Sequence, residues 1–573
     1  KGWTSPIIKY CDINNNGGQQ GGGISIAGDI YYGNAQNCKP IFENLSVRDN
    51  NSGSYGGGGV YFENSSYPTF TNIDFINNSG YEGGAVYTRA NDSIIIFNNC
   101  NFINNTAQYM GGGLWVDNMD LIFNNCNFLS NSSENGGAAL TDWDYNYSTR
   151  NIIFNNSSFK YNYCSFPGVS VIYTNDVDLT LNDVVIDSNF TVMSSTYGPS
   201  INGVLQLYSS SSDVITLFNN VTITNSYAID DGTAGSNGVN NINKGNTVAM
   251  YSNSGYKHDF EIKNTLIANN YGGALEIYSD ATPNLSLIHG TTIANNYGLN
   301  NNLGYGASLN SVRFNNFNPT IRNTIICSGS SDHTSLYLDN SFPDIKNSSI
   351  EYPAQFGYSG NGAYILGTTN LTTYPLFVDT LNNNYRLDDY SSCIGAGLDT
   401  SIALLVDLDG NLRPNPAGSN PDIGAYENPR AIPLIYGCVD TLAYNFNPIA
   451  DTDDGSCLYC NLSDSLFVVD ESAIAAADGK VVLTISGTDC IDPTAENIYT
   501  TESFESGFGL WAQDNNDDAD WSQHSGTTSS SNTGPQDGLA YDGSFYIYTE
   551  ASSPNYPNKI LFYDNLICIK YRL

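Results

Sequence analysis

Asp142, Trp143 and Asp144 form a compact acidic and aromatic cluster, and Trp115 and Asp117 lie one repeat earlier in the chain. An indole ring offers a sugar a flat apolar surface, and carboxylates accept hydrogen bonds from sugar hydroxyls. We therefore predict that these five residues form a ligand-binding face. An acidic, aromatic corner loop without a ligand is the alternative, and catalysis at this cluster is a third hypothesis.

Asp451, Asp453 and Asp454 precede Gly455, an order similar to the first half of a calcium-binding loop. Leu462 stands where an EF-hand has its bidentate glutamate, so the EF-hand is excluded. A weak calcium site and a solvated acidic turn are the two hypotheses for these carboxylates. Calcium is the one cofactor that the sequence suggests.

Cysteines are few, and the 12 Cys form no CxxC…CxxC zinc array. Cys438 and Cys457 are 19 residues apart in a segment too short for a hydrophobic core of its own, which predicts a disulfide. The four histidines lack the i, i+4 spacing of a metal site; they are His258, His289, His333 and His524.

The charge of the chain restricts its partners. It has 573 residues, with 20 basic against 57 acidic side chains and a net charge of −37. Such a charge repels nucleic acid and anionic membranes and attracts cations. No apolar run approaches the ~20 residues that span a bilayer. We expect an extracellular polysaccharide or another surface ligand as partner, no nucleic acid, and no membrane span in this fragment.

Two sequence blocks recur along the first two thirds of the chain. Phe-Asn-Asn-Cys-Asn-Phe begins at Phe97 and again at Phe123, and a glycine cluster with an aliphatic residue follows each copy. From Val60 to Val86 is 26 residues, and from Phe102 to Phe128 is also 26. Runs of four to six β-forming residues are interrupted by Asn-Asn or Gly-Gly, which tolerate left-handed backbone angles and so mark corners.

This period predicts an all-β fold, a right-handed parallel β-helix over residues 1–375 with roughly 14 coils. Residues one period apart should stack, placing Phe102 beside Phe128 and forming an amide ladder from Asn99 to Asn125. Cys100 and Cys126 should stack too, either as a disulfide between coils or as buried free thiols.

The Phe-x-x-Asn and Gly-Gly-Ala repeats resemble those of bacterial polymorphic outer-membrane-type adhesins and related β-helices of the pectin-lyase fold. The resemblance covers residues 1–375 and implies a secreted, extracellular protein at the cell surface, associated with the outer membrane. Pectin-lyase-like enzymes carry sets such as Asn-Thr-Asp, Gly-His-Gly and Arg-Ile-Lys, which this sequence lacks. The sequence identifies no catalytic residues.

Residues 376–430 include Pro421-Asp-Ile-Gly-Ala-Tyr-Glu427 and resemble the terminal segment of secreted bacterial β-helix proteins with varied C-terminal anchors. We expect this segment to cover the open edge of the last coil. Three of its carboxylates could cap turns or bind calcium: Asp407, Asp409 and Asp422.

The remaining chain divides into three parts. Residues 431–460 resemble a small Cys- and Asp-rich module common in secreted bacterial proteins. Residues 461–500 are expected to form a β linker. Residues 501–573 resemble the opening half of a MAM domain, a β-sandwich of adhesion proteins, whose second half is missing, so a truncated sandwich is expected.

A binding or adhesion scaffold is the function that this arrangement favours, with ligands contacted through loops on the β-helix. The glycine- and asparagine-rich stretch from Ser226 to Lys257 interrupts the repeats and is predicted to be a lateral loop. A secreted polysaccharide lyase or glycoside hydrolase is the alternative, since β-helices also carry such enzymes.

Overall fold

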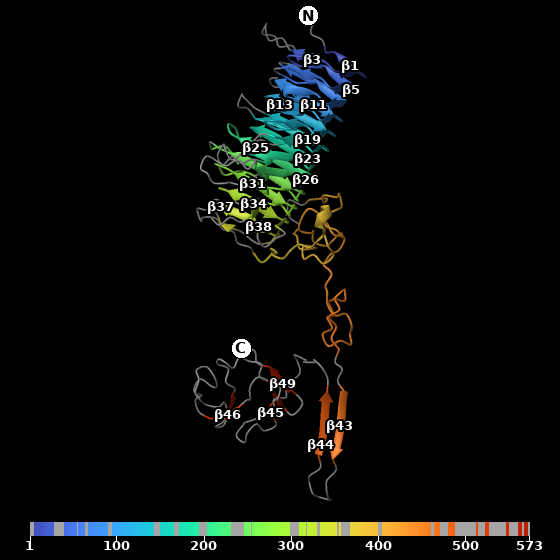
Figure 1. Ribbon diagram of the computed structural model, residues 1–573, viewed down its shortest axis with the longest axis vertical. Helices are drawn as coiled ribbons and strands as arrows, with labels where there is room; N and C mark the ends of the chain where they lie inside the picture. Colours follow the sequence, from blue (N-terminus) through green and yellow to red (C-terminus); the bar gives the residue numbers. More distant parts are fainter. Residues whose placement is uncertain are drawn as a thin grey trace. The chain divides into compact units, whose positions relative to one another are not determined.

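The computed structural model contains three long parallel sheets that wind together as a parallel β-helix (Figure 1). Two compact units are present, residues 1–433 and 434–573. The structure describes residues 5–27, 39–53, 56–63, 67–89, 94–117, 119–142, 149–165, 171–193, 203–230, 246–253, 255–297, 309–316, 318–328, 333–351, 355–356, 367–398, 404–459, 463–469, 480–486, 511–513, 522–525, 546–548, 560–563 and 567–570.

Sheet A is the longest of the three sheets, and in many coils it holds two successive strands. Its strands are β1 (Ile7–Lys9), β2 (Asp12–Asn14), β5 (Ile41–Arg48), β8 (Thr69–Ile76), β11 (Ile94–Asn98), β12 (Asn101–Ile103), β15 (Asp120–Asn124), β16 (Asn127–Leu129), β19 (Arg150–Asn155), β20 (Ser158–Lys160), β23 (Val177–Asp187), β26 (Val214–Thr224), β29 (His258–Lys263), β30 (Leu266–Ala268), β32 (Ser286–His289), β33 (Thr292–Ala294), β35 (Thr320–Arg322), β36 (Ile325–Cys327), β38 (Asp344–Lys346) and β39 (Ser349–Ile350).

Sheets B and C form the other sides of each coil. Sheet B consists of β3 (Gly17–Gly18), β6 (Asn51–Ser52), β9 (Ser79–Glu82), β13 (Thr106–Met110), β17 (Ser132–Ser133), β21 (Tyr163–Cys164), β24 (Phe190–Met193) and β27 (Tyr227–Asp230). Sheet C consists of β4 (Ile24–Ala27), β7 (Val60–Glu63), β10 (Val86–Arg89), β14 (Leu114–Asp117), β18 (Leu140–Asp142), β22 (Ile172–Asn175), β25 (Gly203–Ser209), β28 (Asn246–Ser252), β31 (Gly273–Tyr278), β34 (Leu309–Asn315), β37 (His333–Asp339) and β40 (Gln355–Phe356).

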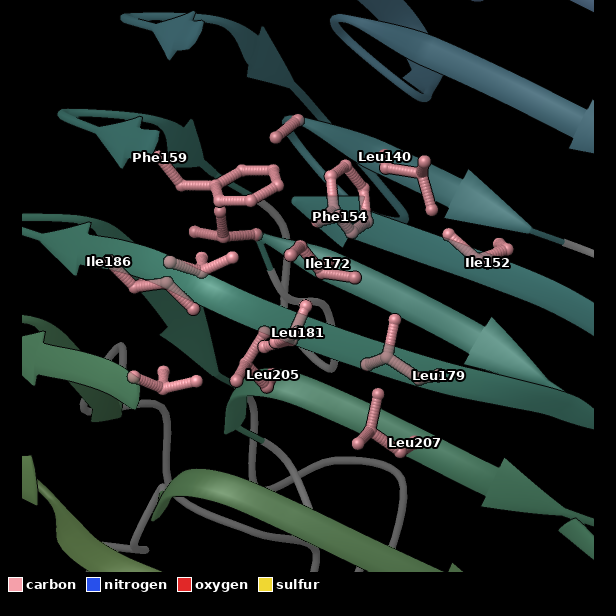
Figure 2. Packing of buried hydrophobic residues seen from close by; sticks show 14 of the residues in the cluster. Leu140, Ile152, Phe154, Phe159, Ile172, Leu179, Leu181, Ile186, Leu205 and Leu207 are labelled. Carbon is pink, nitrogen blue, oxygen red and sulfur yellow. The ribbon is translucent and has the colours of Figure 1, made fainter. Parts of the chain in front are cut away.

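Residues one period apart stack as the sequence predicts. Phe102 pairs with Phe128 in the parallel register of β12 and β16, and their ring centroids are 4.6 Å apart. Phe97 stacks on Phe123 in the same way, at 4.9 Å. These rings belong to a continuous buried core inside the helix, which aliphatic side chains extend through later coils (Figure 2). One repeat period of the sequence therefore corresponds to one coil, and equivalent residues of consecutive coils lie side by side on adjacent strands.

Asparagine and glycine supply the corners, because both accept positive φ at little cost. Asn99 and Asn125 have φ of 51° and 54°, and the Asn125 amide donates to the Asn99 side-chain oxygen at 3.1 Å, which confirms the predicted amide ladder. Gly111 has φ of 74°, and a Cβ there would lie 2.3 Å from the Leu114 carbonyl oxygen. A larger residue cannot occupy this corner without moving the backbone.

A second asparagine ladder is buried inside the corner between sheets A and B. The backbone and side-chain N–H groups of Asn105 both donate to Oδ1 of Asn131 at 3.0 Å. The Asn131 amide in turn donates to the Phe102 carbonyl at 2.8 Å and to Oδ1 of Asn162 at 3.0 Å. Each buried amide thus satisfies backbone groups of the preceding coil and joins consecutive coils.

The number of coils and the state of the stacked cysteines are two features of the β-helix that the sequence period does not determine. Sheet C has twelve described strands rather than the roughly 14 coils expected, because later coils carry longer connections. Thr141 and Tyr173, which pair in sheet C, are already 32 residues apart. Cys100 and Cys126 are buried free thiols, the second of the two arrangements that the sequence left open.

The segment from Leu371 to Arg430 begins at the edge of the last coil, where Leu371 forms a parallel bridge with Ser349 of β39. Its later residues pack against the side of the β-helix. Its strands β41 (Phe377–Asp379) and β42 (Asn384–Leu387) flank a 3₁₀ turn, Thr380–Asn382. In late coils the outward residues of sheet A become apolar, as at Leu266 and Ile325, and the segment buries them. The buried cluster comprises Leu266, Ala268, Ala294, Ile325, Cys327, Tyr385, Leu387, Cys393, Ile394, Ile423, Ala425 and Tyr426.

Acidic side chains of this segment organise its turns. Asp407 accepts hydrogen bonds from the backbone N–H groups of Asn411 and Glu427, at 2.7 and 2.9 Å. Asp422 accepts from Gly395 and Asn428, at 2.7 and 2.6 Å, and burial raises its pKa to about 7. These contacts are the turn and capping interactions that the sequence suggested for Asp407 and Asp422.

The second unit is built of short antiparallel elements. A disulfide joins Cys438 and Cys457, as predicted. The strands of this unit form three small antiparallel sheets in its described residues. β43 (Ser463–Val469) pairs with β44 (Lys480–Ser486), and β46 (Ser522–His524) pairs with β47 (Tyr546–Tyr548). β48 (Ile560–Tyr563) pairs with both β45 (Trp511–Gln513) and β49 (Ile567–Lys570). Most of residues 501–573 lie outside the described residues, so the resemblance to a MAM domain stays a prediction.

His258 is a buried histidine whose pKa is shifted. Its side chain is buried in β29, where a ring nitrogen lies 2.9 Å from the Thr216 hydroxyl. Burial lowers the pKa of His258 to about 4. The imidazole is therefore neutral in the folded protein across the pH range in which an exposed histidine takes up a proton.

The buried asparagine ladder should be a major source of stability. Asn131→Ala leaves buried donors of Asn105 and an acceptor of Phe102 without their partner, so we expect the free energy of unfolding to fall by about 2–4 kcal/mol. Guanidinium unfolding followed by circular dichroism measures this loss. Asn125→Gly is the matched control, since it removes an exposed ladder amide but keeps the positive φ, and should cost less than about 1 kcal/mol. Equal losses for the two variants would contradict the role of the buried ladder.

His258 should make stability depend on pH. Below pH 6.5 the unfolded chain binds a proton at this residue that the folded chain excludes until about pH 4. The free energy of unfolding should therefore decrease by about 2 kcal/mol from pH 7 to pH 4.5 through this group alone. His258→Gln keeps a hydrogen-bonding side chain beside Thr216 but does not titrate, so its decrease should be smaller by that amount. Denaturant unfolding of both proteins at the two pH values checks this, and identical pH dependence would disprove it.

Candidate binding surfaces

Trp115 lies in an aromatic ladder on the outer face of sheet C. Its ring stacks on Tyr87 at 4.4 Å with an interplanar angle of 9°, and Tyr87 stacks on Tyr61 at 5.2 Å. The register of β7, β10 and β14 produces this ladder, because it aligns one aromatic residue per coil. Trp115 is only 3% exposed. A sugar could stack on this indole only if the covering groups moved.

Asp117 lies two residues further along the same strand and is also on the outer face. Its carboxylate forms an ion pair with the Arg89 guanidinium at 3.1 Å, and the Asp117 side chain is 2% exposed whereas Arg89 is 62% exposed. On β7, the coil beyond Arg89, the Tyr61 hydroxyl donates to Glu63 at 2.6 Å, and burial raises the pKa of that hydroxyl. Asp117 is therefore committed to a structural ion pair in this conformation.

The structure separates Asp142 from Trp115. Asp142 pairs with Val116, whose side chain belongs to the core, so it occupies an inward position and is fully buried. Thr141 is the residue aligned with Trp115. Trp143 and Asp144 lie outside the described residues. Of the five residues predicted to form a binding face, the structure thus places Trp115 and Asp117 together on the outer face of sheet C, and their role in binding stays a prediction.

Sheet B carries a second aromatic ladder, which sequence reasoning missed. The rings occupy equivalent positions on consecutive coils and follow the register of β21, β24 and β27 and two further parallel bridges. Neighbouring centroids are 5.5, 6.0, 4.5 and 5.3 Å apart along the series. We call this series the sheet B stripe; its residues are Tyr163, Phe190, Tyr227, Tyr271 and Tyr297.

The stripe differs from the ladder on sheet C in being open to solvent. Tyr163, Tyr271 and Tyr297 are 43%, 42% and 39% exposed. Earlier coils carry Thr106 and Ser132 at the same position, so the stripe begins at β21. Five rings at one per coil extend over about 19 Å, four steps of the ~4.8 Å strand spacing.

The chemistry of the stripe follows from how its rings stack. Tyr227 and Tyr271 are nearly parallel, at 8°, so their facing sides are closed and only their edges can meet a ligand. Phe190 and Tyr227 are inclined by 31°, and Tyr271 and Tyr297 by 32°, which leaves part of those faces uncovered. Such a surface offers apolar contact together with phenolic hydrogen bonding and no charge, a combination common in binding interfaces.

A local sequence signal for the stripe exists. Each of its residues directly follows a residue of the buried corner ladder: Asn162, Asn189, Ser226, Asn270 or Asn296. The stripe intervals are 27, 37, 44 and 26 residues, so a search by fixed period does not detect it.

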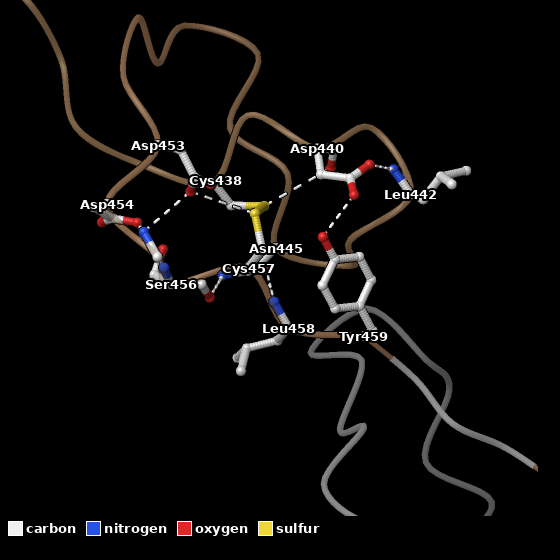
Figure 3. Close-up of a disulfide and its surroundings, with 11 residues drawn as sticks. Cys438, Asp440, Leu442, Asn445, Asp453, Asp454, Ser456, Cys457, Leu458 and Tyr459 are labelled. Atoms are coloured by element: carbon white, nitrogen blue, oxygen red, sulfur yellow. Dashed lines mark hydrogen bonds between the residues drawn. A yellow bond between two sulfur atoms is a disulfide. The ribbon is translucent and has the colours of Figure 1, made fainter.

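The carboxylates predicted to bind calcium lie between Cys438 and Cys457, which a disulfide joins, and they serve separate turns. Figure 3 shows Asp453 and Asp454. Asp451 accepts from the backbone N–H of Ile435 at 3.2 Å. Asp453 accepts from Gly455 at 3.0 Å, and Asp454 accepts from Ser456 at 2.9 Å. Among the described residues, no three His, Cys, Asp or Glu side chains are grouped so that they could hold one metal ion. Calcium binding stays a prediction.

Within the described part of the chain, no helix has the length and apolar character that crossing a membrane requires. A scan against protein-family models gives no match to this chain, and a search of the curated proteins gives none either.

Proposed function

We propose that this protein is a secreted or cell-surface binding scaffold that contacts an uncharged extracellular polysaccharide through the sheet B stripe. The observation that carries the proposal is the stack of five aromatic rings on consecutive coils, three of them about two fifths exposed. Monomeric proteins rarely leave such a contiguous aromatic surface open unless it binds something.

The ligand class follows from charge and shape. The chain has a net charge of −37, so an acidic polymer would be repelled, whereas an uncharged one would not. A linear glycan can lie along a narrow row of rings, with its C–H groups against ring faces and edges and its hydroxyls near the tyrosine hydroxyls. Because the rings are held by successive coils, the row is rigid before the ligand arrives, and little ordering cost is added on binding.

The resemblances found in the sequence agree with this function. Adhesin-type repeats, a terminal segment of the kind found in variably anchored bacterial proteins and a MAM-like region all belong to extracellular binding proteins. We include an extracellular location in the proposal, whereas calcium binding at Asp451, Asp453 and Asp454 and ligand contacts of Trp115, Asp117, Trp143 and Asp144 stay predictions from the sequence.

Removing rings from the stripe should weaken polysaccharide binding. We expect the double variant Tyr271→Ala with Tyr297→Ala to bind at least about tenfold more weakly, because each ring contributes apolar contact. Affinity electrophoresis of the full chain through gels containing neutral polysaccharides measures this. Reducing ends released from each polysaccharide are assayed in parallel, which tests the alternative of a hydrolase. A uronate-containing polysaccharide assayed for unsaturated products tests the alternative of a lyase.

Tyr109→Ala provides the matched control. Tyr109 is 37% exposed on sheet B and stacks on Tyr81, but it lies outside the stripe. This variant should migrate like the unmodified protein. Equal loss in the control and the double variant, or retention of binding by the double variant, would refute the role of the stripe.

A further inference from the structure

The disulfide-linked module, residues 434–459, exposes an unusual amount of apolar surface for its size. Leu442 is 85% exposed and Ile449 is 66% exposed. The segment is too short to enclose a core, and the disulfide between Cys438 and Cys457 holds it instead. Its large apolar side chains that are exposed by more than a third are Tyr436, Val439, Leu442, Tyr444, Phe446, Ile449, Leu458 and Tyr459.

Part of this surface is held together by hydrogen bonds around one carboxylate. Asp440 accepts from the Leu442 backbone N–H at 2.9 Å and from the Tyr459 hydroxyl at 2.6 Å. Tyr444 donates its backbone N–H to the Leu458 carbonyl at 3.1 Å, which joins the two halves of the module. Figure 3 shows the Asp440 carboxylate joined by these hydrogen bonds to the Leu442 nitrogen and the Tyr459 hydroxyl. Scattered exposed apolar residues are ordinary. Apolar side chains that hydrogen bonds hold around one exposed carboxylate, here that of Asp440, form a defined surface.

The charge of the module is of one sign. Residues 434–459 contain Asp440, Asp451, Asp453 and Asp454 and no lysine or arginine. The whole chain is also strongly acidic, at −37, so a second copy would be repelled. A partner that covers this surface must therefore combine apolar side chains with positive charge.

We infer that the surface around Leu442, Asp440 and Tyr459 docks a basic amphipathic segment of another protein. Apolar side chains of the partner cover Leu442 and the Tyr459 ring, and its lysine or arginine side chains approach Asp440 and the neighbouring aspartates. Apolar contact at the centre with charge at the rim is the arrangement that gives protein interfaces both affinity and choice of partner. The inference does not depend on the polysaccharide proposed for the stripe.

Two peptides of equal charge test this on the full chain. One has about 14 residues of lysine and leucine at helical spacing, and in the other serine replaces every leucine. Calorimetric titrations in the presence of a chelator, so that no metal occupies the aspartates, should show the leucine peptide binding at least about tenfold more tightly. Binding of both peptides should weaken with salt.

Variants locate the interaction. Leu442→Ala with Tyr459→Ala should lower the affinity for the leucine peptide to that for the serine peptide, with the disulfide verified by mass spectrometry. Leu381→Ala is the matched control, since Leu381 is 92% exposed but lies in the first unit, and it should change nothing. Stripe variants should also bind the peptide normally, which keeps this test separate from polysaccharide binding. Equal affinity for the two peptides, or unchanged binding by the double variant, would overturn the inference.

Discussion

The stacking of each coil on the next at the strand spacing is the constraint on which the β-helix depends. A residue placed at one position meets its equivalents above and below within ~4.8 Å, so the side chain must attract a copy of itself. Phenylalanine does so by ring stacking, as at Phe102 and Phe128. Asparagine does so because its amide donates and accepts at once, as between Asn131 and Asn162. A charged residue would meet like charge, which explains why only 13% of the chain is charged.

The same constraint shapes the outer surface. A residue type that repeats on an outward position becomes a continuous row, and what the row can do depends on what covers it. On sheet A, the outward positions change from Asn101 and Asn127 to Leu266 and Ile325, and the terminal segment buries the apolar part. On sheet B, the row of tyrosines is open, and this difference in cover makes it the better candidate for binding.

Sequence periodicity predicted the features that repeat and failed for those that do not. The stacked phenylalanines, the exposed asparagine ladder and the disulfide between Cys438 and Cys457 follow from spacing and residue type. The side of the sheet on which Asp142 lies does not, because a shift of one residue reverses the face of a strand and Asp142 pairs with Val116. The stripe was missed because the coils that carry it vary in length.

The β-helix and the disulfide-linked module treat their apolar side chains in opposite ways, and this difference supports the different roles proposed for them. The β-helix encloses its phenylalanines and leaves only selected rows outside, so its binding surfaces are long, rigid and set by the register of the coils. The module has too few residues to enclose Leu442 or Ile449, so the disulfide replaces the core and the apolar side chains face outward. Its surface is small and acidic, and such a surface selects a partner by charge as well as by shape. A rigid row suits a long uncharged polymer, whereas a compact acidic patch suits a short basic segment.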